Sequence, residues 1–527
     1  MFLAISFPKF NLWGLAWLAP GLMLSTAVGK PGKIAFGLGF VAGLGHYLCS
    51  LYWLLLIPLR WHGVVAWLSL SIYMALFPAA WCWVCWRCYP KVKCLSRSGK
   101  IESGATHPFI STSQFQRIRW AVFCGAAWVA MELGIARIFT GFPWNLLGVS
   151  QYKLLPLIQI ASVTGVYGVS FMVVWTSVAM ACAVLMARHT RSTFSMFARE
   201  LAAPFLGLAT IIVFGYIKLS VPDFTGARLK VALIQPGIPQ SVIWDANERT
   251  NRLHKLVELS NAALAERPDL LVWPEAALPP GMVGRTRDTQ QLVTELVRSN
   301  QVWMVFGVID TVGASNKIEL NSAFFIDPNG DLISRYHKRR LVIFGEYMPG
   351  VQWLPFLKKL RAGGAGLGQG RVIVPFQMRQ PRARIAPLIC FEDVFPHLTR
   401  DSVDSETDFL LNLTNNGWFG KSAAQWQHAI SALFRAIENG LPLVRCTNNG
   451  LTCWIDSGGR MHDVYFQGST DIYEAGFKIV EIPLRSSIEK EHAQTIYNRY
   501  GDFFSWACAA ITFAITAGSL RLPRSKK

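Results

Sequence analysis

The sequence is poor in charged residues, and the few it has are unequally divided between the two signs. Only 16% of its 527 residues are Asp, Glu, Lys or Arg, whereas 52% are hydrophobic and 20 are tryptophan. An ordinary soluble globular protein has about 25% charged residues, so this class is excluded. The chain is also too long for one domain. The composition therefore indicates a membrane protein that carries a further domain.

The excess of basic residues does not indicate nucleic-acid binding. The formal net charge is +19, but no recognised nucleic-acid-binding module accompanies it. Lys and Arg lie largely between and after apolar segments, which is typical of the cytoplasmic loops of membrane proteins. We expect a membrane, and no nucleic acid, as a partner.

The cysteines indicate neither a metal site nor a disulfide framework. Seven of the 11 lie in or at the ends of apolar runs, where a thiol behaves as a small hydrophobic group: Cys49, Cys82, Cys85, Cys88, Cys124, Cys182 and Cys508. Three of these have a metal-like spacing, but no His or acid lies nearby, so we expect packing. Cys94 is in a basic loop. Only Cys390, Cys446 and Cys453 remain, too few and too irregularly spaced for disulfides. We predict no metal and no cofactor.

Long apolar runs are the clearest positive signal. A bilayer-spanning helix needs about 20 mostly apolar residues. The candidate stretches lie at 10–28, 34–56, 62–88, 119–140, 156–187, 204–221 and 503–520. We predict a transmembrane helical bundle at 1–221, a soluble domain at 228–500, a C-terminal transmembrane helix at 503–520 and a basic tail at 521–527.

The basic residues predict the orientation of these spans. With six spans before the soluble domain, the links at 30–33, 91–119 and 188–199 and the tail at 521–527 fall on one side of the membrane. The positive-inside rule makes that side the cytoplasm, so the soluble domain lies on the external face. The same count puts Met1 outside, which suggests a missing first helix or two merged ones. The N-terminus carries too little early positive charge for a cleavable signal, so we expect a retained anchor.

Short apolar runs alternate with helical patterns between 228 and 500. Strand-like runs include "RLKVALIQP", "DLLVWPEAA" and "RIAPLIC", and helical patterns include "QWQHAISALFRAIENG". The sequences "FFIDPNGDLI" and "CWIDSGGRMH" each predict a hairpin. The block is therefore predicted to be an α/β layered domain with a mixed sheet.

Three polar residues lie where strand-like runs end. Glu275 follows "LLVWP", Lys338 follows "LISRYH" and Cys390 follows "RIAPLI". Active groups gather outside the carboxyl ends of strands, so the three can converge. Each alone has an ordinary alternative, namely a solvated cap, a surface charge or a core thiol. Together, Glu275 would deprotonate the thiol, and Lys338 would stabilise the thiolate and the oxyanion formed at an attacked carbonyl. The backbone N–H of Phe391 would be a second oxyanion donor.

The segments around these residues resemble the signature motifs of the nitrilase superfamily. They read "WPEAALP" (273–279), "YHKRRLVIFGEYMP" (336–349) and "ICFEDVF" (389–395). The resemblance implies a triad of Glu275, Lys338 and Cys390 and the superfamily's αββα sandwich.

A nitrilase-like domain flanked by membrane helices resembles the apolipoprotein N-acyltransferase family. Further stretches, such as "TGFPWN" (140–145) and "NLTNNGWFGKSAAQWQH" (412–428), are similar to the same family. The sequence departs from the family in a short N-terminus, where we expect its first membrane helix to be missing, and in a basic insertion near 90–118. It also has Phe391 where many members carry Tyr.

The resemblance implies an acyltransferase of the bacterial inner membrane, with its catalytic domain on the periplasmic side. Cys390 would take the sn-1 acyl chain of a phospholipid as a thioester, with phosphatidylethanolamine as the expected donor. The α-amine of a diacylglyceryl-cysteine apolipoprotein would then receive the chain as an amide. We expect the enzyme to be a monomer.

Supporting residues are expected near the triad. Glu346 would orient Lys338 or share its charge, and Glu392 would support the loop after the nucleophile. Three aromatic residues are expected to form an apolar entry for acyl chains: Trp244, Trp418 and Phe419. The Gly-rich stretch 351–370 predicts a mobile lid at the bilayer. Cys446 is a poor rival nucleophile, because the resembling segment usually has a small hydroxyl residue there.

Two other functions remain open from the sequence. A membrane-anchored nitrilase-type amidase would use the same triad, but it would need neither six helices nor lipid-facing aromatics. A transport or scaffold protein would only bind, and the complete triad argues against it.

Overall fold

The computed structural model forms two compact units. It describes residues 1–58, 61–90, 112–189, 194–221, 224–243, 245, 247–278, 287–313, 317–343, 345–347, 366–492 and 494–521. The first, the helical unit, comprises Met1–Tyr52, Val65–Ser220 and Tyr500–Lys527. The second, the sheet unit, comprises Trp53–Val64 and Val221–Arg499.

The helical unit contains the apolar helices. Its main helices are α1 (Phe2–Ile5), α2 (Ala19–Ala27), α3 (Gly32–Ser50), α4 (Trp61–Arg87), α5 (Gln114–Arg137), α6 (Leu155–Ile158), α7 (Ala161–Thr164), α8 (Val166–His189), α9 (Phe194–Leu219) and α16 (Phe503–Arg521). Within the described residues, five helices are long and apolar enough to cross a membrane: α4, α5, α8, α9 and α16. The prediction of a membrane helical bundle is confirmed.

The predicted number of spans is wrong at the N-terminal end. The stretch 10–28 is not one helix but a 3-10 helix, Trp13–Trp17, followed by the nine-residue α2. Pro20 lies in the first turn of α2, where proline is tolerated because no backbone N–H is needed there. The 3-10 helix before it ends at Trp17 and does not continue into α2. The stretch 156–187 likewise begins with α6 and α7, and Gly165, with φ +67°, separates them from α8.

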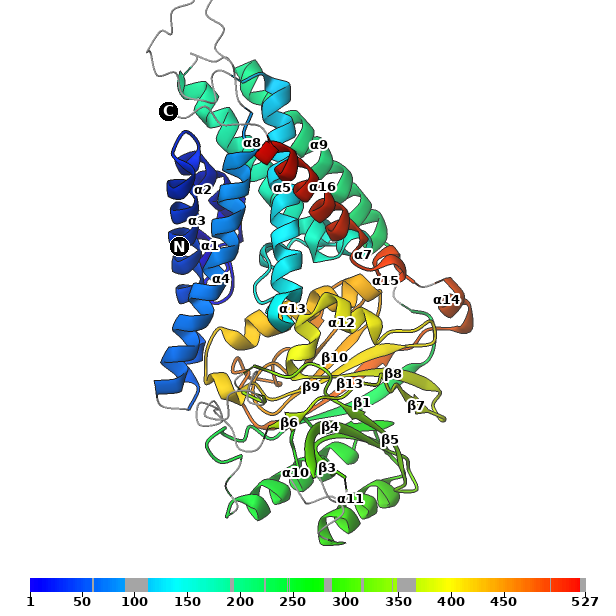
Figure 1. The fold of residues 1–527 in the computed structure, drawn as a ribbon. Coiled ribbons are helices and arrows are strands. Elements are labelled where there is room, and N and C mark those ends of the chain that lie inside the picture. The colour runs from blue at the N-terminus through cyan, green and yellow to red at the C-terminus, as the bar shows by residue number, and fades with distance from the viewer. Residues whose placement is uncertain are drawn as a thin grey trace, which may run out of the picture. The chain divides into compact units, whose positions relative to one another are not determined.

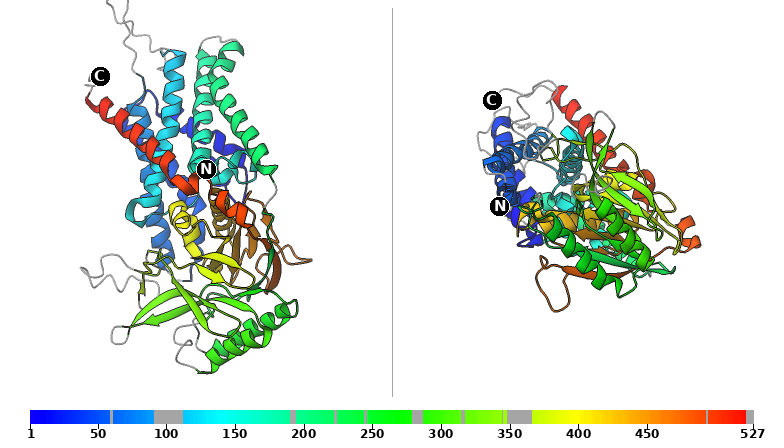
Figure 2. Two further views of the ribbon diagram at one scale, coloured as in Figure 1. Left: turned by 90° about the vertical axis from the view of Figure 1, so that its right-hand side faces the viewer. Right: turned by 90° about the horizontal axis from the view of Figure 1, so that it is seen from below.

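The five long helices alternate in direction within the helical unit. Helices α4, α8 and α16 end at the same end of the unit, where α5 and α9 begin (Figures 1 and 2). The basic segments 91–119, 188–199 and 521–527 therefore follow or precede helices at that single end. This grouping does not depend on how the first 60 residues are counted.

Small residues allow close packing in the helical unit. A Cβ at Gly21 would lie 2.2 Å from the Ser177 carbonyl oxygen, so α2 and α8 approach more closely than any side chain would permit. The Gly21 N–H also donates to Ser177 Oγ at 2.9 Å. Close approach at small residues, with hydrogen bonds between helices, is how helices associate where lipid removes the hydrophobic driving force.

The sheet unit contains two sheets of described strands. The first, in the order β13-β1-β2-β3-β4-β5 with β6 beside β4, comprises β1 (Arg228–Gln235), β2 (Leu270–Val272), β3 (Trp303–Val312), β4 (Ile318–Ile326), β5 (Leu332–His337), β6 (Leu367–Gly368) and β13 (Gly476–Pro483). The second, in the order β12-β11-β10-β9-β8-β7, comprises β7 (Phe376–Met378), β8 (Ala383–Ile389), β9 (Phe409–Thr414), β10 (Leu443–Thr447), β11 (Cys453–Ile455) and β12 (Met461–His462). Strands β1–β3 and β8–β10 pair in parallel, as do β4 and β6, and the other pairs are antiparallel, so the predicted mixed sheet is confirmed. The two predicted hairpins are the antiparallel pairs β4–β5 and β11–β12.

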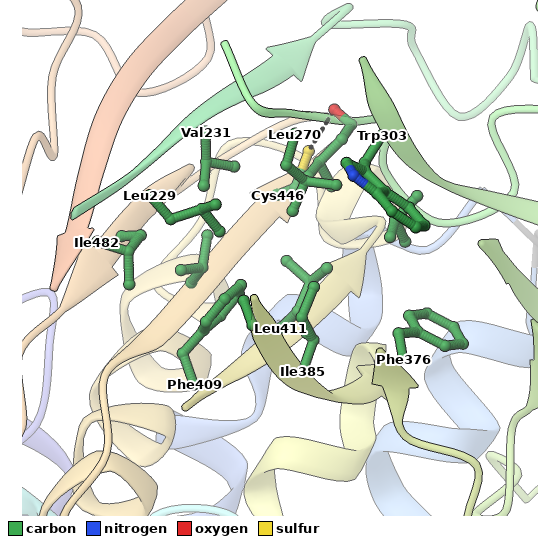
Figure 3. Close-up of a cluster of buried hydrophobic side chains, with 14 of the residues drawn as sticks. Leu229, Val231, Leu270, Trp303, Phe376, Ile385, Phe409, Leu411, Cys446 and Ile482 are labelled. Atoms are coloured by element: carbon green, nitrogen blue, oxygen red, sulfur yellow. Dashed lines mark hydrogen bonds between the residues drawn. The ribbon is translucent and has the colours of Figure 1, made fainter. Parts of the chain in front are cut away.

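Successive side chains of each strand point to opposite faces of the sheet, and this alternation builds the layers of the sheet unit. On β1, Leu229, Val231 and Leu233 face the other sheet, where they join residues such as Phe409 and Leu411 in one buried cluster (Figure 3). The alternate residues of β1 pack against helices α10 (Arg249–Leu264) and α11 (Arg287–Asn300). Helices α12 (Pro396–Asp401) and α13 (Ala424–Asn439) cover the second sheet (Figure 1). The expected αββα sandwich is confirmed.

Candidate active site

Three strand ends position the predicted triad. Glu275 follows β2 by three residues, Lys338 directly follows β5, and Cys390 directly follows β8. The backbone is unusual beside two of them, since Cys390 has φ +51° and Ala276, next to Glu275, has φ +50°. Left-handed conformations of non-glycine residues cost energy and cluster at functional sites. The structure thus brings together residues that are more than 50 positions apart in the chain.

Lys338 lies between two carboxylates. Its Nζ donates to Glu275 Oε1 at 3.2 Å and to Glu346 Oε1 at 2.7 Å, and the lysine side chain is only 1% exposed. Burial by itself would lower the pKa of Lys338, but Glu275 and Glu346 more than offset it and raise that pKa well above its ordinary value. Lys338 therefore remains a cation at any ordinary pH.

Two asparagines fix the Glu275 carboxylate, and sequence reasoning missed both. Asn321 Nδ2 donates to Glu275 Oε1 at 2.8 Å and to Glu346 Oε1 at 3.2 Å, while the backbone N–H of Asn415 donates to Glu275 Oε2 at 2.8 Å. Asn321 is a buried amide within the apolar strand β4. A polar residue buried inside a strand needs a partner, and that was the available signal.

Cys390 begins a short 3-10 helix, Cys390–Val394, and its side chain is half-buried. Burial and the negative charge of Glu275 raise the pKa of the Cys390 thiol to about 12, against the opposing effects of Lys338 and the Thr414 hydroxyl. Its carbonyl oxygen accepts from Asn412 Nδ2 at 2.9 Å, which holds the turn. The thiol is therefore neutral at rest and needs a base before it can attack.

The raised pKa predicts the pH dependence of Cys390 alkylation. A thiol of ordinary pKa reacts at a rate that levels off above about pH 9, because it is then mostly thiolate. For Cys390 we expect the iodoacetamide rate to rise about tenfold per pH unit from pH 7 to pH 10. Quantitative peptide mass spectrometry would measure it, with a free cysteine peptide as the control. A plateau below pH 9 would contradict the prediction.

Glu392 ties the nucleophile turn to the segment that follows Lys338. Its Oε2 accepts from the Ile389 N–H at 2.7 Å and from the Tyr336 hydroxyl at 2.8 Å. Its Oε1 accepts from the N–H groups of Arg339 at 2.6 Å and Arg340 at 3.1 Å. The carboxylate is fully buried, and this burial raises its pKa. One side chain thus holds two of the three strand ends together.

A buried charged layer lies beneath the nucleophile turn. Asp393 accepts from His428 Nε2 at 2.7 Å and pairs with Arg445 through its other oxygen. His428 Nε2 also lies 3.3 Å from the Cys390 carbonyl oxygen. Sequence reasoning gave these residues no role, because Asp393 and His428 lie in motifs that do not record which residues meet in the fold.

The predicted aromatic entry is described only in part. Trp418 and Phe419 lie on a 3-10 helix, Asn416–Phe419, and both are half-buried. The Phe419 ring packs edge-on against Trp53, with ring centroids 4.5 Å apart. Trp244 and most of the predicted lid lie outside the described residues. The described end of that segment adjoins the triad, because the Gly370 N–H donates to the Lys338 carbonyl at 2.8 Å.

The remaining candidates have defined surroundings. The Phe391 ring packs edge-on against Phe395 at 4.9 Å. Cys446 lies in the core between the sheets, where its thiol contacts the Ile234 and Val272 carbonyls at 3.4 Å each (Figure 3). Burial raises the pKa of the Cys446 thiol, and the described residues around it include no acid–lysine pair. Cys446 is therefore a core residue.

Comparison with known proteins extends over both units. A family model described as carbon-nitrogen hydrolase matches residues 230–486, and one described as the apolipoprotein N-acyltransferase N-terminal domain matches residues 1–179. The apolipoprotein N-acyltransferase of Geobacter metallireducens is 36% identical, over 98% of this chain and 93% of that protein. The one from Rickettsia prowazekii is 30% identical, over 89% of this chain and 87% of that protein. Among solved structures, an amidase from Nesterenkonia sp. matches with a TM-score of 0.38 and 16% identity, over 53% of this chain and 98% of that chain.

Proposed function

Because the chain belongs to the apolipoprotein N-acyltransferase family, a membrane-embedded acyltransferase group of the nitrilase superfamily, we propose that it N-acylates lipoproteins through a thioester on Cys390. The expected acyl donor is a phospholipid, with phosphatidylethanolamine first. The acceptor is the α-amine of a diacylglyceryl-cysteine apolipoprotein. The observation that carries the proposal is the cluster of Glu275, Lys338 and Glu346, whose charges influence the Cys390 thiol.

In the first half-reaction, Glu275 takes the thiol proton as the sulfur attacks the sn-1 ester carbonyl. Lys338, a buried cation held by two carboxylates, stabilises the oxyanion together with the backbone N–H of Phe391. The carbon–oxygen bond of the ester then breaks, and Glu275 returns its proton to the leaving alkoxide. The products are a lysophospholipid and an S-acyl Cys390.

In the second half-reaction, the acceptor amine attacks the thioester carbonyl. Glu275 removes the proton from the attacking nitrogen as the amide bond forms, and the thiolate leaves and is reprotonated. Glu346 keeps Lys338 in position throughout, because its 2.7 Å contact with Nζ is the shorter of the two ion pairs. Glu392 holds the nucleophile turn against the segment after Lys338 through its hydrogen bonds.

Acyl chains would reach the site past aromatic side chains. Trp244, Trp418 and Phe419 are proposed to form the apolar entry, and the segment 351–370 to act as its lid. These roles fit a reaction in which both substrates are lipids. A nitrilase-type amidase acting on small amides would need neither feature. We propose that the enzyme works as a monomer.

The proposed location is the bacterial inner membrane, with the sheet unit in the periplasm. The ends of α4, α8 and α16 and the starts of α5 and α9, to which the basic segments are joined in the sequence, lie at one end of the helical unit, and the chain leaves α9 and enters α16 at the other (Figures 1 and 2). The positive-inside rule then assigns the basic end to the cytoplasm. This argument needs only the alternation of the five long helices.

Cysteine labelling tests the orientation. In cells with a permeabilised outer membrane, a maleimide that cannot cross the inner membrane should label a Lys317→Cys variant, because Lys317 is exposed on the sheet unit. Cys94, within the basic segment, should be labelled only after the inner membrane is opened. The detergent-solubilised protein, in which both positions are accessible, is the control. The reverse pattern would overturn the orientation.

Mass spectrometry of Cys390 tests the reaction. After incubation with a phospholipid that carries a labelled sn-1 chain, we expect that chain on Cys390, and its transfer to a diacylglyceryl peptide on addition of the peptide. The Cys390→Ser variant should lose acyl transfer. Transfer that survived this substitution would exclude the thioester mechanism, and hydrolysis of small amides without transfer would favour the amidase.

A further inference from the structure

A cavity in the helical unit is lined by buried polar side chains that the proposed reaction does not use. The cavity volume is about 30 Å³, room for a small group such as an ammonium. The polar residues are His46 on α3, Glu132 on α5 and Asn145 in the segment between α5 and α8, with exposed fractions of 6%, 2% and 6%. Polar side chains within a membrane-embedded bundle are costly and usually serve a function.

Each of these residues presents an acceptor with no hydrogen-bond partner in the described part of the chain. The atoms are Glu132 Oε2, Asn145 Oδ1 and, in the tautomer protonated at Nε2, His46 Nδ1. The other Glu132 oxygen is fixed, because it accepts from Trp128 Nε1 at 2.9 Å and from the Leu147 N–H at 2.7 Å. The Ser170 hydroxyl also lies beside this carboxylate. The Asn145 Nδ2 donor also has no partner there. Buried polar groups are normally paired, so three unpaired acceptors against one unpaired donor indicate a ligand that is mainly a hydrogen-bond donor.

Aromatic rings form much of the remaining wall. Phe7, Tyr47, Trp128 and Trp144 line the cavity, whereas no Lys or Arg is among its described lining residues. A carboxylate with aromatic faces in a desolvated site favours an organic cation. An anion would meet the Glu132 carboxyl group without a cationic side chain among the described lining residues.

We propose that this cavity binds a primary ammonium group within the helical unit. A primary ammonium has three N–H donors and one positive charge, which match the three acceptors and the carboxylate. A quaternary ammonium would satisfy the charge but none of the acceptors. Water would satisfy the acceptors but not the charge. The source of the ammonium is a lipid headgroup, the amine of a lipidated peptide, or a free small amine.

Native mass spectrometry of the full chain in detergent would measure this binding. A Cys390→Ala background prevents turnover and keeps the result independent of the proposed reaction. We expect phosphatidylethanolamine to bind in preference to phosphatidylcholine with the same acyl chains. Glu132→Gln should reduce that preference about tenfold or more, because hydrogen bonds to charged groups are worth that much in affinity. Any lipid bound at the Cys390 site contributes equally to both proteins.

A matched control separates binding from stability. Glu200→Gln makes the same substitution in the helical unit, where Glu200 pairs with buried Arg117 and does not line the cavity. It should keep the headgroup preference even though it breaks a buried ion pair. Asn145→Asp adds an acceptor charge and should strengthen the preference, a gain that misfolding cannot mimic. Both residues tolerate the left-handed conformation that Asn145 adopts, with φ +56°.

Competition would identify the source. Displacement of phosphatidylethanolamine by ethanolamine, or by a diacylglyceryl-cysteine peptide with a free amine, in a Glu132-dependent manner supports the site and names its ligand. Binding of the lipid alone supports the headgroup. The proposal is overturned if Glu132→Gln leaves the preference unchanged, or if Glu200→Gln lowers it equally. It is also overturned if none of the three amines binds in a Glu132-dependent way, which would leave a cavity that holds water only.

Discussion

Replacing Glu275 with Gln is expected to slow thioester formation on Cys390 by about 10²–10⁴-fold, the usual contribution of a general base. The Cys390 thiol has a pKa raised to about 12, so without a neighbouring base almost no thiolate forms at neutral pH. The amide keeps the shape of the carboxylate but cannot take the proton. Rapid quenching with a labelled phospholipid, followed by mass spectrometry of Cys390, would measure the rate.

The fold of the Glu275→Gln variant must be checked separately. The amide nitrogen would face a donor, either the Asn415 N–H or Lys338, so one hydrogen bond is lost. If buried Cys446 is alkylated as slowly as in the parent protein, the sheet unit of the variant is still folded. Glu481→Gln, an exposed position on β13, is the matched control and should acylate at the parent rate. An acyl-enzyme that still accumulated at the parent rate in Glu275→Gln would remove Glu275 from the base role.

Glu392→Ala should destabilise the sheet unit by about 3–5 kcal/mol, the cost of breaking a buried charged network. The substitution leaves four donors without an acceptor: the N–H groups of Ile389, Arg339 and Arg340 and the Tyr336 hydroxyl. Each buried, unsatisfied donor is expensive. Acyl transfer should fall as well, because the nucleophile turn and the segment after Lys338 lose their common support. The rate of Cys446 alkylation against temperature would report the loss of stability.

Two further variants complete this test. Glu392→Gln keeps one acceptor oxygen and should be intermediate. Glu406→Ala removes a half-exposed carboxylate whose ion pairs, at 3.8 Å to Arg382 and 4.0 Å to Lys490, are near the surface. Its cost should be less than about 1 kcal/mol. If Glu392→Ala were as stable as Glu406→Ala, the buried network would not contribute as argued.

Sequence patterns predicted the layers of the fold well and the membrane spans less well. Runs such as "RLKVALIQP" and turns such as "DPNG" have a local cause, in β-branched composition and in backbone conformations that Pro, Asn and Gly favour. Both predicted hairpins are present. The stretch 10–28 is as apolar as a span, but Pro20 and the turn before it divide it. Hydropathy sums over a window and does not register such a break.

The candidate site divides in the same way between local and long-range causes. Glu275, Lys338 and Cys390 could be proposed from the sequence because each follows a strand-like run within a motif of its own, and Glu346 and Glu392 because they share those motifs. The residues that orient these side chains could not be proposed from the sequence. Asn321 reaches Glu275 from β4 and Asn415 from the residue after β9, and no local pattern records either contact.

The sequence by itself determined that this chain is a membrane protein with an α/β domain. It also determined that a cysteine, a lysine and a glutamate follow strands of that domain, because composition, periodicity and motif are local properties. Only the tertiary structure decided what surrounds them. It made Lys338 a permanent cation by burying it between two carboxylates, kept the Cys390 thiol protonated, and gathered His46, Glu132 and Asn145 around one cavity. The charged state of a side chain, its burial and the pairing of its acceptors depend on neighbours that are far apart in the chain. Only folding brings these neighbours together.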